Sequence, residues 1–472
     1  MLFSSITFLY FFFPVVLGLY FITPMPRGSM ALRNGVLLAA SIVFYLWGEP
    51  VYVLLLLGQT VAGWFFGLLI EKWRVDQRKA KAALVCSIIV ALAALGFFKY
   101  ADFFVENVSA LIDVPLTTLK LALPIGISFY TFQILSYNID LYRGKAKVQR
   151  NLLTFATYVT SFPQLVAGPI IRYVHIENDL TKRQHTLSDF SCGIRRFTVG
   201  LGKKVLIANT LGELVAIYKD SGEASLLFVW LYAVAFALHI YFDFSGYSDM
   251  AIGIGRMLGF HFRENFNYPY IAASVTDYWR RWHISMSGWF RDYVYIPLGG
   301  NRVPPARHIF NIIVVWILTG LWHGADWNFI LWGLFYAGIL LLEKFAIGKF
   351  LQRIPVAGHL FVIVCFLIGS VFFDAANMQE AAARLGMMFG SGINVMIGPE
   401  ALYYLRSYSV LILIAVIGAT PLPARLAGKF FSTKKGLGIR MVAEPLFVLV
   451  ILVTATAFLV DGSFNPFIYF RF

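Results

Sequence analysis

The sequence predicts an all-α polytopic membrane protein. Of its 472 residues, 59% are hydrophobic, 17% are aromatic and only 14% are charged. A typical globular domain carries about 25% charged residues, so a soluble fold of this composition would expose a large apolar surface to water. Continuous apolar runs of about 15–20 residues recur along the chain, close to the length of a membrane-spanning helix. A transmembrane β-barrel would instead show short segments of alternating polarity.

The apolar runs predict twelve membrane crossings. The first run has no basic segment before it and no small-residue cleavage site after a short core, so we expect a retained span and not a signal peptide. In chain order, the predicted crossings cover residues 3–22, 31–47, 51–70, 83–98, 121–139, 205–219, 226–256, 308–322, 327–342, 359–373, 405–421 and 442–460.

Residues 151–171 are also apolar, but Pro163, Gly168 and Pro169 interrupt them. Irregular backbone is tolerated in a membrane only where protein shields it, so this segment is predicted to be a broken or re-entrant element. No internal repeat, linker or low-complexity stretch divides the chain. We therefore expect one domain over residues 1–472.

The net charge of +14 is explained by the placement of the basic residues. Loops on one side of the twelve crossings hold 32 of the 39 Lys and Arg residues but only nine of the 25 Asp and Glu residues. Cytoplasmic loops are enriched in Lys and Arg, so we expect the basic loops in the cytoplasm and both termini outside it. The charge thus indicates a protein embedded in a lipid bilayer, with no nucleic-acid partner. Two long cytoplasmic segments, 172–204 and 261–307, are expected to form interfacial helices where an intracellular substrate docks.

The three cysteines, Cys86, Cys192 and Cys365, lie far apart in the sequence. Two of them fall in apolar runs, and no CxxC or Cys/His pattern is present. This spacing predicts neither a disulfide framework nor a bound metal.

Residues 239–249, HIYFDFSGYSD, form the richest polar stretch within an apolar run. Polar side chains are costly in a membrane, which makes each one a functional candidate. Two interpretations stay open: a buried polar network that fixes helix packing, or the polar lining of a tunnel. The candidates for a tunnel lining are Asp243, Ser245, Tyr247 and Asp249.

Residues 277–302 interleave arginines with tryptophan, phenylalanine and tyrosine. One interpretation is an amphipathic segment in contact with anionic lipid headgroups. The other is a site for an anionic, partly planar ligand such as the nucleotide of coenzyme A, because arginines bind phosphates and aromatic rings stack on a base. The candidates for phosphate binding are Arg280, Arg281, Arg291 and Arg302, and the same segment contains His283.

The segment 319–328, TGLWHGADWN, separates two apolar runs and places His323 deep in the bilayer. A lone histidine on an apolar face is usually a core residue. A neutral imidazole, with a pKa near 6.5, is however able to take a proton from a hydroxyl group at neutral pH. His323 is therefore a catalytic candidate, and Asp326 and Asn328 are further candidates for the tunnel lining.

These stretches together resemble the membrane-bound O-acyltransferase (MBOAT) family. Within it they resemble the bacterial branch that O-acetylates exported polysaccharides such as alginate, cellulose and peptidoglycan. The resemblance covers nearly the whole chain, and its most specific part is WRRWHIS at 279–285 followed by WHGA at 322–325. Further matching stretches are PIGISFYTFQ (124–133), LVAGPIIR (165–172), YFDFSGYSDMAIG (241–253), ENFNYPY (264–270) and LGGNR (298–302).

The resemblance implies a ring of about 11–12 transmembrane helices, with re-entrant and interfacial helices, around a central tunnel. It implies that His323 is the catalytic residue, and that His283 lines the same tunnel and positions the acyl group or the acceptor. Acetyl-CoA is the implied donor, as a co-substrate and not as a permanently bound cofactor. The implied acceptor is an exported or cell-wall polysaccharide, reached directly or through a periplasmic or surface acetyltransferase partner. The implied location is the bacterial cytoplasmic (inner) membrane.

The C-terminal sequence SFNPFIYFRF supports two interpretations. It is an interfacial aromatic anchor, or the hydroxyl group of Tyr469 accepts the acyl group and passes it to an extracytoplasmic partner. In the second case, residues 442–472 form an acyl-relay segment.

Several alternatives stay open from the sequence. One alternative is an MBOAT enzyme that uses a carrier-protein thioester as donor, or a lipid or protein as acceptor. A second alternative is a secondary transporter, although inverted repeats are absent. A third is a non-catalytic scaffold of an export machine, which would tolerate the loss of both His283 and His323.

Overall fold

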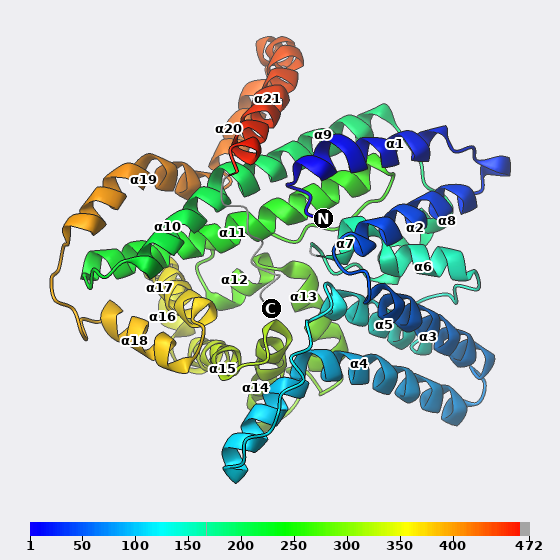
Figure 1. Cartoon of the computed structure of the whole chain (residues 1–472), viewed down its shortest axis with the longest axis horizontal. Helices are drawn as coiled ribbons and strands as arrows, with labels where there is room; N and C mark the ends of the chain where they lie inside the picture. Colours follow the sequence, from blue (N-terminus) through cyan, green and yellow to red (C-terminus); the bar gives the residue numbers. More distant parts are fainter. Residues whose placement is uncertain (167, 463–472) are drawn as a thin grey trace. The chain divides into compact units, whose positions relative to one another are not determined.

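In a computed structural model of the chain, the structure describes residues 1–166 and 168–462. These residues form helices and connecting segments, with one isolated bridge between Ser225 and Val395 and no other β-structure among them (Figure 1). The all-α class predicted from the sequence is therefore confirmed. Tyr469, and with it the end of the 442–472 segment, lies outside the described residues.

Eight helices of the described chain are long and apolar enough to cross a membrane, which confirms a multi-pass membrane protein. Two shorter apolar helices precede them, at Phe8–Ile22, where a π-turn leads into α1 (Phe13–Ile22), and at α2 (Ala31–Leu46). The eight are α3 (Val53–Lys72), α4 (Gln77–Ile112), α11 (Leu226–Met257), α14 (Pro305–His323), α15 with its continuation (Trp327–Arg353), α17 (Pro355–Asp374), α19 (Pro399–Gly418) and α21 (Lys434–Val460).

Some predicted crossings have different bounds in the structure. The crossing predicted at 121–139 is α5 (Ile127–Tyr142), which is buried along nearly its whole length and includes the buried Asn138. The Asn138 side-chain amide donates to Gly63 O at 3.2 Å and to Ser87 Oγ at 2.7 Å. Other helices therefore surround α5, and they satisfy polar groups that lipid would not. The crossing predicted at 205–219 consists of a π-turn, Lys203–Ala208, and α10 (Asn209–Asp220).

The interrupted segment 151–171 forms two short helices, α6 (Leu152–Thr160) and α7 (Phe162–Leu165). They break at Ser161, one residue before the start of α7 and two before Pro163. The broken element predicted from its proline and glycine residues is therefore present, and all of its described residues from Thr154 to Leu165 are buried.

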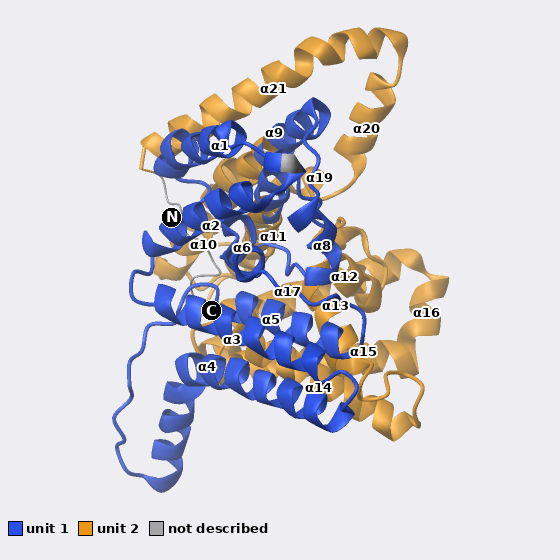
Figure 2. Cartoon of the chain, turned by 90° about the vertical axis from the view of Figure 1, so that its right-hand side faces the viewer, with its two compact units in different colours: residues 1–197, 248–263 blue, residues 198–247, 264–472 orange. Residues whose placement is uncertain are grey.

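The helices fall into two compact units, which Figure 2 distinguishes by colour. Unit 1 contains residues 1–197 and 248–263, and unit 2 contains residues 198–247 and 264–472. The long helices α9 (Leu187–Gly202) and α11 each contribute to both units. The single domain predicted from the sequence stays a prediction.

Unit 1 has an aromatic core where its first helices meet. The rings of Phe8 and Phe13 stack at 5.5 Å, and Phe44 of α2 contacts Phe162 of α7 at 5.6 Å. Besides these helices, the unit contains α8 (Tyr173–Thr181) and the first part of α9.

Unit 2 is built around a hairpin of α14 and α15. A Cβ atom at Gly333 would meet the Trp316 carbonyl oxygen, and one at Gly320 would meet the Phe329 carbonyl oxygen, so both glycines are required for the two helices to pack this closely. The turn follows directly after His323. The hairpin therefore fixes the position of His323 inside the unit.

The remaining helices of unit 2 are short or peripheral. Two short helices, α12 (Val275–Arg281) and α13 (Ile284–Phe290), follow α11 along the chain and flank His283. The others are α16 (Gly348–Arg353), α18 (Met378–Met388) and α20 (Leu422–Phe431).

Candidate active site around His283 and His323

His323 is the last residue of α14 and lies in an aromatic environment. It is 4% exposed. Its ring contacts those of Trp322, Trp332 and Phe373 edge to face, with centroids 4.9, 5.0 and 5.1 Å apart. The neighbouring helices α15 and α17 thus enclose the imidazole with indole and phenyl rings.

His283 occupies the turn between α12 and α13 in a left-handed backbone conformation, with φ of 42°. Such a φ is uncommon for a residue with a side chain, and it persists only where the surroundings impose it. The extended segment beside the turn does so: Ile284 N donates to Asn265 O at 2.9 Å, and Ser285 Oγ donates to Asn265 Oδ1 at 2.8 Å. The turn therefore places the His283 side chain in one fixed direction.

The His283 imidazole is completely buried, and neither of its ring nitrogens has a hydrogen-bond partner among the described residues. Burial lowers the pKa of His283 to about 3, so the ring is neutral at physiological pH. A buried polar group without a partner costs about 1–3 kcal/mol. A ring with two unused nitrogens is suited to binding a group that the chain itself does not provide.

Trp322 connects the two histidines that the sequence singled out. Its indole ring lies 4.9 Å from His323 and 5.7 Å from His283, centroid to centroid. Phe244 of α11 closes the other side of His283 at 4.7 Å. The structure therefore brings both histidines into one aromatic site within unit 2.

A cavity of about 740 Å³ lies in the same unit. Trp316, in its wall, contacts Trp332 at 5.9 Å, and Trp332 contacts His323 at 5.0 Å. A chain of aromatic rings thus leads from the cavity to the catalytic candidate. The charged and titratable side chains of the wall are Arg280, Tyr295, His308, Glu343, Lys344 and Lys349.

Of the four arginines predicted to bind phosphate, Arg280 alone belongs to this wall. Arg281 forms an ion pair with Asp277 at 2.8 Å. Arg291 pairs with Asp292 at 2.7 Å, and this contact raises the pKa of Arg291. Arg302 is exposed. The wall lysines, Lys344 and Lys349, lie in a predicted basic cytoplasmic loop, and no motif around them indicated a binding role.

Glu343 is the one carboxylate in the cavity wall. Its Oε2 accepts from Val275 N at 2.5 Å, and its Oε1 accepts from the Thr276 backbone N–H and hydroxyl group at 3.2 and 2.6 Å. These two residues begin α12, so Glu343 neutralises the positive end of the helix that carries Arg280.

The polar stretch at 239–249 contributes mainly to packing. Asp243 forms an ion pair with Lys204 at 2.5 Å, and both side chains are almost completely buried. His239 Nδ1 lies 2.6 Å from Ala208 O. These contacts join α11 to the π-turn and α10 and favour the packing interpretation. Lys204 was not predicted as a partner because it is the last residue of the predicted cytoplasmic segment 172–204, where a lysine is expected to be exposed.

The other predicted lining residues are distributed differently. Ser245 and Tyr247 are buried in α11 of unit 2. Asp249 belongs to unit 1, where Arg196 binds it at 2.6 Å. Asp326 caps α15, and its Oδ1 accepts from Asn328 N at 3.4 Å.

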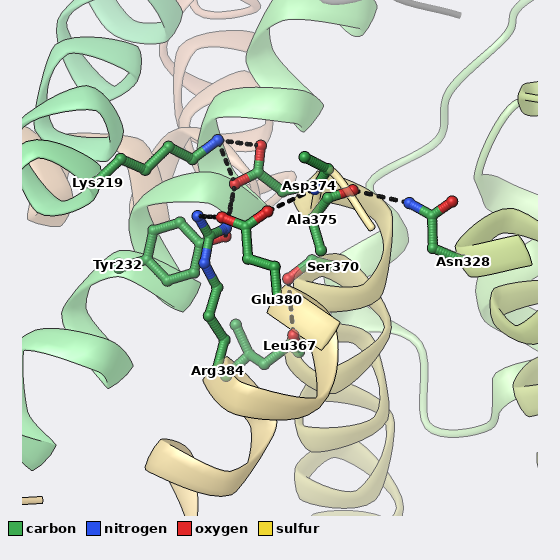
Figure 3. A network of polar contacts seen from close by, with 10 residues as sticks. Lys219, Tyr232, Asn328, Leu367, Ser370, Asp374, Ala375, Glu380 and Arg384 are labelled. Atoms are coloured by element: carbon green, nitrogen blue, oxygen red, sulfur yellow. Dashed lines mark hydrogen bonds and ion pairs between the residues drawn. The ribbon is translucent and has the colours of Figure 1, made fainter. Parts of the chain in front are cut away.

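A polar network that no local sequence motif indicated holds the end of α17 (Figure 3). Asp374 accepts from Lys219 Nζ at 2.7 Å, from the Tyr232 hydroxyl group at 2.5 Å and from Arg384 Nη1 at 3.1 Å. Asn328 Nδ2 donates to Ala375 O at 2.7 Å. Because Phe373, which contacts His323, directly precedes Asp374, the network fixes one wall of the site.

Among the described residues, no group of three or more His, Cys, Asp or Glu side chains is arranged to hold a metal ion.

Comparison with known proteins connects this site to an enzyme family. Residues 144–373, which include both histidines, match the family described as MBOAT, membrane-bound O-acyltransferase. A probable alginate O-acetylase AlgI of Azotobacter vinelandii is 42% identical over 83% of this chain and 79% of its own length. A probable alginate O-acetylase AlgI of Pseudomonas aeruginosa is 43% identical over 83% of this chain and 75% of its own length. A peptidoglycan O-acetyltransferase of Helicobacter pylori is 33% identical over 83% of this chain and 80% of its own length.

The network around Asp374 predicts a loss of stability on substitution. Asp374→Asn leaves Lys219 opposite a neutral amide and leaves Arg384 with Glu380 as its carboxylate partner. Removing one partner of a fully buried ion pair costs about 3–5 kcal/mol, which is an upper bound for this partly exposed network. We expect Asp374→Asn to lower the unfolding temperature of the protein in detergent, measured by tryptophan fluorescence. Asp220→Asn is the matched control, because Asp220 neighbours Lys219 but is exposed. Equal unfolding temperatures for Asp374→Asn and the wild type would contradict this role.

Proposed function

Because the chain belongs to the membrane-bound O-acyltransferase family and is an acyltransferase, we propose that it moves an acetyl group from cytoplasmic acetyl-CoA across the membrane for O-acetylation of an exported or cell-wall polysaccharide. The printed names of its relatives, alginate O-acetylase and peptidoglycan O-acetyltransferase, support a polysaccharide acceptor. The observation that carries the proposal is the pair of buried histidines joined by aromatic rings to a cationic cavity.

In this proposal, His323 acts as general base. Its imidazole takes the proton from an acceptor hydroxyl group while the oxygen attacks the thioester carbonyl carbon. The carbon–sulfur bond then breaks, and the leaving thiolate takes up a proton to become the free thiol. The rings of Trp322, Trp332 and Phe373 keep water away from the thioester, which would otherwise be hydrolysed.

His283 positions the reacting group and stabilises its charge. Its low pKa keeps the ring neutral, so one ring nitrogen carries a hydrogen and the other a lone pair. The N–H group can donate to the oxyanion that develops on the thioester carbonyl. A neutral donor that is already fixed in place requires no reorganisation when the charge appears.

The donor nucleotide is assigned to the 740 Å³ cavity. Arg280, Lys344 and Lys349 supply positive charge for its phosphates, and the indole of Trp316 offers an apolar wall. Arg281 and Arg291 are neutralised by their own carboxylate partners, so Arg280 is the arginine to which we assign the phosphate contact.

The proposed direction of transfer follows from the placement of charges. With the basic loops in the cytoplasm of a bacterial inner membrane, the donor enters through the segments around Arg280 and Lys344. The acceptor side is then extracytoplasmic, where a periplasmic or surface acetyltransferase would receive the acetyl group. We assign the transfer between the two sides to the hydroxyl group of Tyr469, as a covalent acyl carrier.

His323→Ala tests the catalytic assignment. We expect acetyl transfer by the purified protein to fall by about 10²–10⁴-fold, the usual contribution of a general base. Labelled acetyl-CoA and a polysaccharide acceptor give the rate, and size-exclusion profiles verify folding. His261→Ala is the control, because it removes an exposed histidine outside unit 2. A wild-type rate for His323→Ala would overturn the assignment.

Arg280→Gln and Lys344→Gln test the donor cavity. Each is expected to raise the KM for acetyl-CoA about tenfold with little change in kcat, because a charge-assisted hydrogen bond contributes about 1.5–3 kcal/mol. Arg302→Gln removes an exposed arginine of the same segment and serves as the control. If Arg280→Gln and Lys344→Gln both have the same KM for acetyl-CoA as the wild type and the control, the donor binds elsewhere.

Tyr469→Phe tests the relay. The substitution keeps the aromatic ring and removes the nucleophile, so acetyl transfer to the acceptor is expected to fall to the background rate. Protein incubated with labelled acetyl-CoA should also lose its covalent label at this residue. Tyr403→Phe, which changes an exposed tyrosine, is the control. Unchanged acetylation of the acceptor by Tyr469→Phe would exclude the relay.

A further inference from the structure

Three arginines of the described chain are almost completely buried: Arg33, Arg183 and Arg384, with exposures of 7, 5 and 8%. Arg384 is neutralised by two carboxylates, those of Asp374 and Glu380. Arg33 and Arg183, both in unit 1, form no ion pair with any described residue. A buried guanidinium without a counterion is energetically costly. The burial of Arg33 and Arg183 without a carboxylate partner therefore requires an explanation, whereas the burial of Arg384 does not.

Arg183 uses only part of its hydrogen-bonding capacity. Its Nε donates to the Tyr20 hydroxyl oxygen at 3.1 Å, and its Nη2 donates to Asn34 Oδ1 at 2.5 Å. The guanidinium also lies 4.3 Å from the centroid of the Phe260 ring. Its Nη1 is buried and has no hydrogen-bond partner among the described residues. The two N–H groups on Nη1 of Arg183 are thus left without an acceptor among the described residues.

Arg33 faces the same cluster from the start of α2. Its Nε donates to Thr23 O at 3.1 Å, and its Nη1 lies 3.4 Å from His185 Nδ1. His185 Nε2 lies 2.9 Å from the Tyr20 hydroxyl group, which donates to Leu258 O at 3.0 Å. Nδ1 is then the acceptor for Arg33, and Nε2 carries the hydrogen. This pattern requires a neutral His185.

The charge of the cluster is therefore carried by the two guanidinium groups. Burial, together with Arg33 and Arg183, lowers the pKa of His185, in agreement with its neutral tautomer. Asp179 acts on Arg183 electrostatically but forms no ion pair with it. Its Oδ2 instead accepts from His261 N at 3.0 Å. Two like charges, held close enough to interact, remain without an anion from the described chain.

We propose that Arg33 and Arg183 form a binding site for a phosphate oxyanion. Guanidinium groups present parallel N–H donors that match phosphate oxygens, and two of them suit the charge of one phosphate group. His185, which is partly exposed, marks the open side of the cluster.

The position of the cluster favours the phosphate of an anionic phospholipid headgroup as the ligand. Tyr20 and Arg33 lie near the ends of two apolar helices, where such helices leave the hydrocarbon core. Ile22 and Leu32, beside the cluster, are 82 and 49% exposed and offer an apolar surface to acyl chains. Free inorganic phosphate has the same oxyanion chemistry, and the experiment separates the two sources.

Native mass spectrometry of the full-length protein in detergent tests the site. We expect the wild type to bind dioleoylphosphatidylglycerol at least fivefold more tightly than dioleoylphosphatidylcholine. Arg33→Gln and Arg183→Gln should reduce this ratio to about one. Arg78→Gln removes an exposed arginine of the same unit outside the cluster and should keep the wild-type ratio.

Inorganic phosphate is tested separately, by its effect on the unfolding temperature of the wild type in phosphatidylcholine nanodiscs. If phosphate raises the unfolding temperature and Arg183→Gln abolishes this rise, the site binds soluble phosphate. If phosphate does not raise the unfolding temperature but the wild type prefers phosphatidylglycerol, the site binds the lipid. The proposal is overturned if the wild type shows neither effect, a result that requires no variant to fold. It is also overturned if the folded variants keep the wild-type ratio. Either failure leaves the proposed acetyl transfer unaffected.

Discussion

A polar side chain in the interior of a bilayer has no water to bind, so its partner must come from the protein or from a substrate. This constraint organises unit 2. Asp374 has three donors around it, and Asp243 has Lys204. His283 is different, because it is completely buried and has no hydrogen-bond partner among the described residues. The two carboxylates are satisfied within the chain, whereas the ring nitrogens of His283 stay available for a group that the chain does not supply.

The aromatic packing around the histidines follows from the same constraint. Indole and phenyl rings enclose His323 on several sides and separate it from water. Close approach of the helices is possible because Gly320 and Gly333 have no side chain where α14 and α15 meet. The strained turn at His283 is tolerated because Asn265 binds the backbone and side chain of the residues that follow it.

The class of fold could be predicted from the sequence, because lipid imposes an apolar composition. The distinctive local motifs around His283 and His323 marked both residues as candidates, and their catalytic roles stay a prediction. The bounds of α5 could not be predicted from the apolar run, because the run begins at residue 121 whereas the helix begins only after Gly126, which has a left-handed backbone conformation. Lys204 and Asp374 were missed for a different reason. A local pattern shows that a residue is charged, but the partner that makes it structural lies far away in the sequence, as Lys219 does from Asp374.

Ion pairing, more than the number of charges, decides which cations of this chain are available for the proposed phosphate contact. Arg281 and Arg291 lie in the same basic segment as Arg280, yet each has a carboxylate within 3 Å, so a phosphate would have to displace an existing partner. The carboxylate in the cavity wall, Glu343, accepts three hydrogen bonds from the start of α12. Its negative charge is therefore directed toward a helix terminus and away from the ligand. In the proposed donor site, Arg280, Lys344 and Lys349 therefore determine the electrostatic potential that an incoming phosphate meets.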